Sequence, residues 1–287
     1  MNKRLAIYFV LIVCVMVFGY HGINAFLEWH ERWVGENKWE DIRDVFVGDL
    51  QSPIIVEDIE DNDTSALGTL DVFDGDVQRV ESVQVTPYEV PNLNIDFVSL
   101  RSEQNDDIYA WIYIPDTKIN YAVLQHPTEE NYYLDHNIDD SKGYPGCIYS
   151  QSLNSKDFSD RNTVLYGHNM KNGAMFAGLH LYSDYEYMSQ HPYVFVYTEK
   201  YTLVYKVFAA QRSDDRHQLK EYNLGTTSGW LDYISNLTLN SNKNYVYDKT
   251  TAIGSTSRIL TMSTCIGNDE YRWLVHGILI NVIIKEE

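Results

Sequence analysis

The sequence contains few cysteines, few basic residues and none of the short motifs that bind metals or nucleotides. Only three of the 287 residues are cysteines, and no Cys-x-x-Cys, His-Glu-x-x-His or calcium-loop pattern occurs. The sequence therefore predicts no bound metal, and because a glycine-rich phosphate loop is also missing, it predicts no cofactor. The chain has 22 basic and 41 acidic residues, which give a net charge of −19. This charge repels phosphate backbones, so nucleic acid is not an expected partner.

The composition is that of a folded, β-rich protein. Hydrophobic residues make up 44% of the chain, which is enough for a packed core. Aromatic residues make up 14%, with 23 tyrosines, and aromatic side chains fit the half-buried surface of a pleated sheet.

The N-terminal segment has the pattern of a membrane anchor. Lys3 and Arg4 precede an apolar run at 5–27 that contains no acidic residue, lysine or arginine, and about 23 residues can cross roughly 30 Å of hydrocarbon as a helix. A cleaved signal peptide is the alternative, but no small-x-small cleavage site follows the run. The flanking charges predict a cytoplasmic N-terminus at 1–4, a transmembrane signal anchor at 5–27 and an extracellular remainder.

Three further segments follow the anchor. Residues 28–48 carry spaced aromatic residues among charges, a pattern typical of an amphipathic helix, and we interpret them as a helical stalk. Residues 49–90 contain 11 acids between Asp49 and Glu89 and one base, Arg79, which predicts an acidic flexible linker. The folded domain is expected over 91–287.

The folded domain contains many short strand-like runs and no βαβ rhythm. Strands are predicted at 109–125 (two runs separated by a Pro-Asp-Thr-Lys turn), 146–150, 162–166, 193–197, 202–211, 258–264 and 272–284, and helices at 94–105, 175–187 and 227–237. This order predicts a mainly β fold, a closed or nearly closed β-barrel with helices in its loops.

Cys265 is the residue most suited to nucleophilic chemistry. It ends one predicted strand, and Arg272 begins the next, so a hairpin would place the thiol and the guanidinium on adjacent strand ends. A nearby cation favours the thiolate, and a guanidinium can donate hydrogen bonds to a developing oxyanion. The other exported cysteine, Cys147, is interpreted as a buried bystander, and a Cys147–Cys265 disulfide is the alternative that would abolish activity.

A cysteine nucleophile needs a proton donor for the leaving group, usually a histidine. His168 is the preferred candidate because it follows a predicted strand and Gly167. His276 is the competitor, on the same strand face as Arg272 but within an apolar run where a core histidine is more common. For a further set of histidines we expect solvated positions: His126, His136, His180, His191 and His217.

The stretches LYGHNMKNGAMF (165–176) and LTMSTC (260–265), followed by Arg272, resemble the signature of sortases, the membrane-anchored transpeptidases of Gram-positive bacteria, and most closely class B. The resemblance extends to WIYIPDTKINYAVLQ (111–125) and NYYLDHN (131–137), and covers the chain from residue 92 onward. It implies an eight-stranded sortase β-barrel in which His168, Cys265 and Arg272 are catalytic.

The resemblance also implies further roles and partners. Ser263, Thr264 and Tyr166 are the predicted substrate-binding residues, although each has an ordinary structural role as the alternative. The implied partners are surface proteins with C-terminal sorting signals, like NPQTN or LPXTG, cleaved after threonine, and an amine of peptidoglycan or its lipid-linked precursor. The alternatives are polymerisation of pilin subunits and an exported cysteine peptidase that uses water as acceptor.

Overall fold

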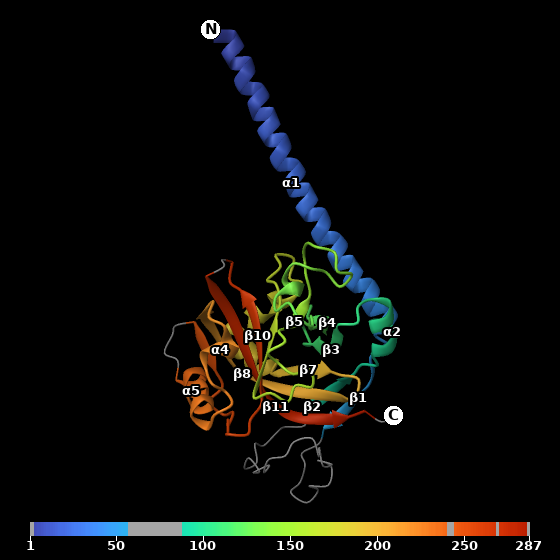
Figure 1. Cartoon of the computed structure of the whole chain (residues 1–287), viewed down its shortest axis with the longest axis vertical. Helices are drawn as coiled ribbons and strands as arrows, with labels where there is room; N and C mark the ends of the chain where they lie inside the picture. Colours follow the sequence, from blue (N-terminus) through green and yellow to red (C-terminus); the bar gives the residue numbers. More distant parts are fainter. Residues whose placement is uncertain (1–2, 57–87, 240–243, 268–269, 286–287) are drawn as a thin grey trace, which may run out of the picture.

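Figure 1 shows the computed structural model, a β-barrel from which one long helix projects. The structure describes residues 3–56, 88–239, 244–267 and 270–285, and for residues 3–16, 28, 31 and 32 it describes the backbone alone.

Eight strands of the described residues close into the barrel. They are β3 (Ile108–Tyr113), β4 (Asn120–Leu124), β5 (Ile148–Ser150), β6 (Asn162–Tyr166), β7 (Tyr193–Tyr197), β8 (Tyr201–Asp214), β10 (Ile259–Cys265) and β11 (Tyr271–Ile284). Their order is β11-β10-β6-β5-β4-β3-β7-β8, and β8 pairs back with β11. A short strand, β9 (Tyr245–Tyr247), extends the edge of β8 beyond the part that β7 covers. The predicted eight-stranded barrel is confirmed.

Successive side chains of β10 point alternately into the barrel and away from it. Leu260 and Met262 belong to the main hydrophobic core, whereas Ile259 packs in a second cluster with Trp230 of a covering helix. Because successive side chains of a strand point to opposite faces, Cys265 lies on the outer face together with Ile259. This face carries the candidate site.

The helices lie in the loops between strands. They are α2 (Phe97–Glu103), the 3₁₀ helices η1 (Tyr132–Leu134) and η2 (Phe176–Ser183), α3 (Tyr185–Gln190), α4 (Gln218–Glu221) and α5 (Thr227–Thr238). The helix predicted at 175–187 is divided in two at Asp184, whose side chain accepts a hydrogen bond from the amide of Glu186 and caps α3. Thr226 caps α5 in the same way, and α5 covers the outer face of the barrel through Trp230, Tyr233 and Leu237.

The N-terminal helix α1 (Lys3–Phe46) is continuous, and its last turns pack on the barrel while its first turns extend away (Figure 1). Trp39, Ile42 and Phe46 are buried in the main core, and the ring of Trp39 meets that of Tyr121 at 5.3 Å edge to face. Within the residues described, we find no helix that combines the length and apolarity needed to cross a membrane. The anchor predicted at 5–27, whose first half falls on residues without described side chains, stays a prediction.

The structure contains a pair of strands at the ends of the segment 49–90, for which the sequence predicts a flexible linker. β1 (Gln51–Val56) pairs antiparallel with β2 (Tyr88–Asn92), because the β-branched run Ile54–Val56 matches Val90 and its neighbours. Both ends of the predicted linker are therefore strands, and the intervening 57–87 lie outside the described residues.

Candidate active site

The pairing of β6 with β10 brings His168 level with Cys265. The two strands are parallel, and Ile259 pairs with Asn162 as Ser263 pairs with Tyr166, a constant offset of 97 residues. His168 and Cys265 are separated by the same 97 residues. The amide of Gly167 donates to the carbonyl of Ser263 at 3.1 Å, so the ladder continues toward both residues.

A side-chain contact confirms that the two strand ends stay together. Asn169, the residue after His168, donates from Nδ2 to the carbonyl oxygen of Cys265 at 3.0 Å. The loop that carries His168 is closed by its own backbone, since the amide of Phe176 donates to the carbonyl of His168 at 2.9 Å.

Arg272 lies beside Cys265 on the other side of β10. The antiparallel register of β10 and β11 pairs Cys265 with Arg272 directly, and directly paired residues have their side chains on the same face. Nη1 of Arg272 donates to the carbonyl of Tyr271 at 3.1 Å. Cys265 and Arg272 therefore lie side by side at adjacent strand ends, as the hairpin predicted.

The ring of His168 is held by two residues of one loop. Its Nε2 donates to the carbonyl of Leu134 at 2.6 Å, and its ring lies 5.1 Å from that of Tyr144. Because a carbonyl only accepts hydrogen bonds, Nε2 carries a proton, which leaves Nδ1 for exchange with the thiol or a substrate. Burial lowers the pKa of His168 below its usual 6.5, and the hydrogen bond to Leu134 and the charge of Asp135 only partly oppose this.

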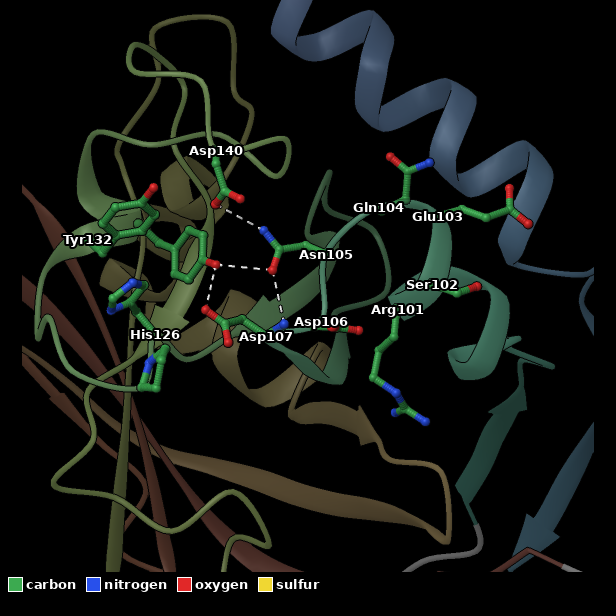
Figure 2. Close-up of a pocket in the computed structure, with 12 residues that line it drawn as sticks. Arg101, Ser102, Glu103, Gln104, Asn105, Asp106, Asp107, His126, Tyr132 and Asp140 are labelled. Carbon is green, nitrogen blue, oxygen red and sulfur yellow. Dashed lines mark hydrogen bonds between the residues drawn. The ribbon is translucent and has the colours of Figure 1, made fainter.

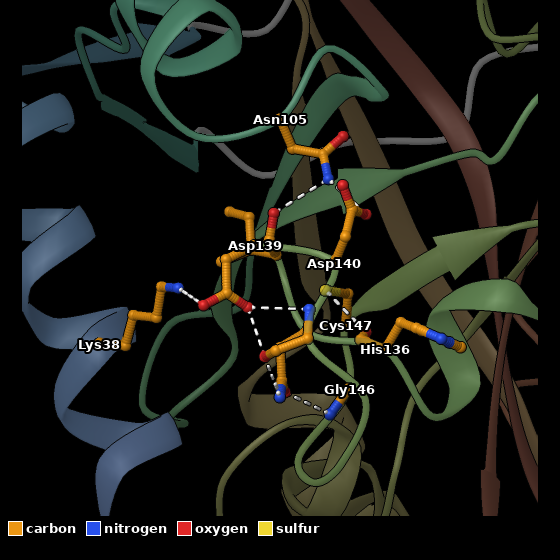
Figure 3. Close-up of polar contacts among 10 residues, drawn as sticks. Lys38, Asn105, His136, Asp139, Asp140, Gly146 and Cys147 are labelled. Carbon is orange, nitrogen blue, oxygen red and sulfur yellow. Dashed lines mark hydrogen bonds and ion pairs between the residues drawn. The ribbon is translucent and has the colours of Figure 1, made fainter.

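The loop from 134 to 147 is anchored to helix α1, as Figure 3 shows. Lys38 of α1 forms an ion pair with Asp139 at 2.5 Å. Burial alone would raise the pKa of Asp139, but hydrogen bonds from Lys38 and Ser141 lower it to about 2, so the carboxylate stays charged. A second contact between α1 and the site joins Glu36 to Asn172 of the His168 loop at 2.6 Å.

Cys147 lies in this loop as a free, buried thiol. Its Sγ contacts the carbonyl of His136 at 3.6 Å (Figure 3), and burial raises its pKa well above the ordinary value. Cys265 is also free and is half-buried. The structure thus contains no Cys147–Cys265 disulfide.

Tyr166 and Tyr149 form an aromatic wall next to the site. They pair across β5 and β6, and their rings stack at 5.4 Å. Burial raises the pKa of both hydroxyls, and the charge of Arg272 acts on both in the opposite direction. The substrate-binding role of Tyr166 stays a prediction, and Tyr149, within the predicted strand at 146–150, is its stacking partner.

The two predicted residues before the nucleophile lie on opposite faces of β10. Ser263 shares the outer face with Cys265, whereas Thr264 points the other way and both are buried. The Thr264 hydroxyl is buried without a hydrogen-bond partner among the described residues. This position favours a substrate role for Ser263 over one for Thr264.

His276 shares the outer face with Arg272, as expected, but is fully buried under α5. Its Nδ1 lies 3.0 Å from Thr261 Oγ1, which in turn contacts the hydroxyl of Tyr233 at 3.1 Å. Burial lowers the pKa of His276 to about 3. His276 is therefore a neutral core histidine.

His180 was expected to be solvated, and the structure corrects this expectation. It is half-buried, and its Nε2 donates to the carbonyl of Cys265 at 3.1 Å. Sequence reasoning missed this residue because its neighbours Leu179 and Leu181 suggest an ordinary helix rather than a contact with β10.

A cavity of about 470 Å³ lies away from the three candidate catalytic residues. Figure 2 shows its walls, which come from Arg101–Asp107, His126, Pro127, Tyr132, Tyr133 and Asp140. Its polar side chains bond to one another: Tyr133 donates to Asp107 at 2.8 Å and to Asn105 at 3.2 Å. No group of three potential metal ligands occurs in the described part of the chain.

Known proteins match this chain in both sequence and fold. The sequence model of the sortase domain matches residues 112–280. A curated Sortase B of Listeria monocytogenes is 33% identical over 180 residues, which cover 61% of this chain and 71% of the relative.

Two solved structures extend the comparison. Sortase B from Listeria monocytogenes is 30% identical with a TM-score of 0.55, and the match covers 63% of this chain and 99% of that one. A Staphylococcus aureus sortase B-substrate complex is 25% identical with a TM-score of 0.54, and the match covers 64% of this chain and 84% of that one.

Proposed function

The chain belongs to the sortase family, is most like its class B members and is a cysteine transpeptidase, and from this premise we propose that it attaches surface proteins to the cell wall. It would cleave a C-terminal sorting signal after threonine and transfer the threonine carbonyl to an amine of peptidoglycan or its precursor. The observation that carries the proposal is the alignment of His168, Cys265 and Arg272 across β6, β10 and β11.

Each of the three side chains has a chemical role in this reaction. The thiolate of Cys265 attacks the threonine carbonyl, and Arg272 stabilises the oxyanion that develops. The imidazolium of His168 then protonates the departing amide nitrogen through Nδ1, since Nε2 is engaged by Leu134. The C–N bond breaks and a thioester remains. In the second half the neutral imidazole accepts a proton from the attacking amine, and Cys265 leaves as thiolate.

The lowered pKa of His168 predicts that only a minority of the protein molecules is in the protonation state that reacts. The reaction needs thiolate and imidazolium together, but the pKa of His168 is lowered by burial. Near neutral pH most imidazole rings are therefore neutral, and the imidazolium that the reaction needs is the minority form. Slow turnover is the expected consequence.

The proposed location is the outer face of a cell membrane, with residues 5–27 as a single-pass anchor and the N-terminus inside. Lys3 and Arg4 before the apolar run support this orientation. Proteinase accessibility of the domain in intact cells and in inverted vesicles tests it.

Incubation with fluorescent NPQTN-like and LPXTG-like peptides plus an amine tests the reaction. We expect an amide product and a thioacyl intermediate, found by mass spectrometry as a mass increase on Cys265. Cys265→Ala should abolish both, and Cys147→Ala is the matched control that should retain both. Cleavage with water as the sole acceptor would instead establish a peptidase and contradict the proposal.

A further inference from the structure

The carbonyl oxygen of Cys265 accepts hydrogen bonds from two side chains. Asn169 donates from Nδ2 at 3.0 Å and His180 from Nε2 at 3.1 Å. A carbonyl oxygen has two lone pairs, so both acceptor positions of this group are used. Both donors come from the segment between β6 and β7, which also carries His168.

His180 is itself fixed by its surroundings. Its ring stacks on that of Trp273 at 5.9 Å with an interplanar angle of 23°. Trp273 belongs to β11 and donates from Nε1 to the carbonyl of Leu179, the residue before His180, at 2.9 Å. The stack and this hydrogen bond hold the imidazole in the orientation that reaches Cys265.

We propose that His180, acting together with Asn169, is a positioning residue for the Cys265 thiol. The carbonyl group and the side chain of Cys265 share one Cα atom, so fixing the carbonyl limits rotation of the backbone that aims the sulfur. Because Asn169 follows His168 directly, the same two bonds also fix the spacing between the imidazole and the thiol. A displacement of about 1 Å at a reacting group can lower the rate about 100-fold, so this restraint is relevant to turnover.

The restraint does not depend on the charge of His180. The acceptor is a carbonyl, so Nε2 must carry a proton, and both the neutral ring with its proton on Nε2 and the imidazolium satisfy this condition. His180 is thus distinct from His168, whose change of protonation state drives the reaction. The inference rests on the proposed function, because it concerns the thiol of that same reaction.

Two replacements of His180 separate positioning from packing. His180→Phe keeps an aromatic ring against Trp273 but removes the donor, whereas His180→Gln restores an N–H near the position of Nε2. We expect His180→Phe to lower kcat in transpeptidation about tenfold with KM nearly unchanged, and His180→Gln to recover most of the loss. His191→Phe is the matched control, since His191 also stacks on an aromatic ring, Tyr187 at 4.3 Å, and should leave kcat unchanged.

A readout without turnover keeps this test separate from that of the proposed function. The backbone order parameter at Ile266, measured by ¹⁵N relaxation, should fall in His180→Phe from a rigid value of about 0.85 and recover in His180→Gln. Asn169→Leu, an exposed change, should give the same direction of effect even where His180→Phe unfolds the domain.

The outcomes are distinct. Unchanged kcat and unchanged order parameters in His180→Phe and Asn169→Leu would overturn the inference. A lowered kcat that His180→Gln fails to recover would overturn it as well. If the unaltered protein turns over none of the peptides, the proposed function fails, and the order parameters alone decide whether His180 restrains Cys265.

Discussion

Replacing Gly167 with alanine tests the alignment of His168 with Cys265. Gly167 directly precedes His168, and its amide makes the hydrogen bond to Ser263 that extends the β6–β10 ladder. A Cβ atom at this position would lie far inside van der Waals contact of Cδ1 of Ile148 and 2.9 Å from two ring carbons of Phe176. Ordinary carbon–carbon contacts are about 3.5–4.0 Å, so either the backbone or both neighbours must move.

The cost follows from the burial of these neighbours. Ile148 and Phe176 are both fully buried, and an added methyl group in a packed core costs about 1–3 kcal/mol. In a domain of this size such a loss lowers Tm by roughly 2–12 °C. A shift of His168 approaching 1 Å would also lower kcat by up to about 100-fold.

Thermal unfolding and kcat of the folded protein measure the two effects separately. Ile148→Val removes Cδ1 and should recover part of both losses when combined with Gly167→Ala, giving a non-additive double-mutant cycle. Gly254→Ala is the matched control, because the nearest atom to its added Cβ is 3.9 Å away. If Gly167→Ala retained the Tm and kcat of the unaltered protein, the close packing described around the His168 loop would be refuted.

Three further predictions concern the thiols and histidines. Cys147→Ala should retain kcat while Cys265→Ala loses all activity, measured with the peptide assay; equal losses would contradict the assignment of Cys147 as a structural residue. Because the pKa of His276 is about 3 in the folded protein and about 6.5 in the unfolded chain, the unfolded state binds the extra proton between these values. Stability should therefore fall by about 1.4 kcal/mol per pH unit as the pH drops below 6.5, and urea unfolding of His276→Gln should lack this contribution. The charge of Asp135 raises the pKa of His168, so Asp135→Asn should move the acidic limb of the kcat/KM profile to lower pH; a limb that stays in place would show that another group titrates there.

The sequence predicts the strands of the site well, because each is a continuous apolar or β-branched run with clear ends. The predicted strand at 162–166 matches β6, and those at 258–264 and 272–284 match β10 and β11 to within one residue at each end. The pairing of Cys265 with Arg272 was also predictable, since a short connection between neighbouring strands favours an antiparallel hairpin.

The pairing of His168 with Cys265 could not be derived from sequence patterns alone. Parallel strands 97 residues apart acquire their register from the whole barrel, and no local signal specifies it. The burial of His276 was expected from its apolar run, but the element that covers it, α5, comes from a distant part of the chain and could not be predicted. His180 illustrates a third limit, since its hydrogen bond to Cys265 depends on how η2 lies against β10.

Because α1 is one continuous helix, it limits the distance between the Cys265 thiol and the proposed membrane anchor. If residues 5–27 lie in a membrane as we propose, residues 28–35 form a stiff rod of about 12 Å before the contacts of Glu36, Lys38 and Trp39 join α1 to the barrel. A catalytic domain fixed to such a rod keeps a fixed distance from the point where the helix leaves the lipid, whereas a flexible tether would let that distance vary. Substrates would then be captured from a thin layer above the lipid, and lengthening the rod by two helical turns would move that layer by about 11 Å.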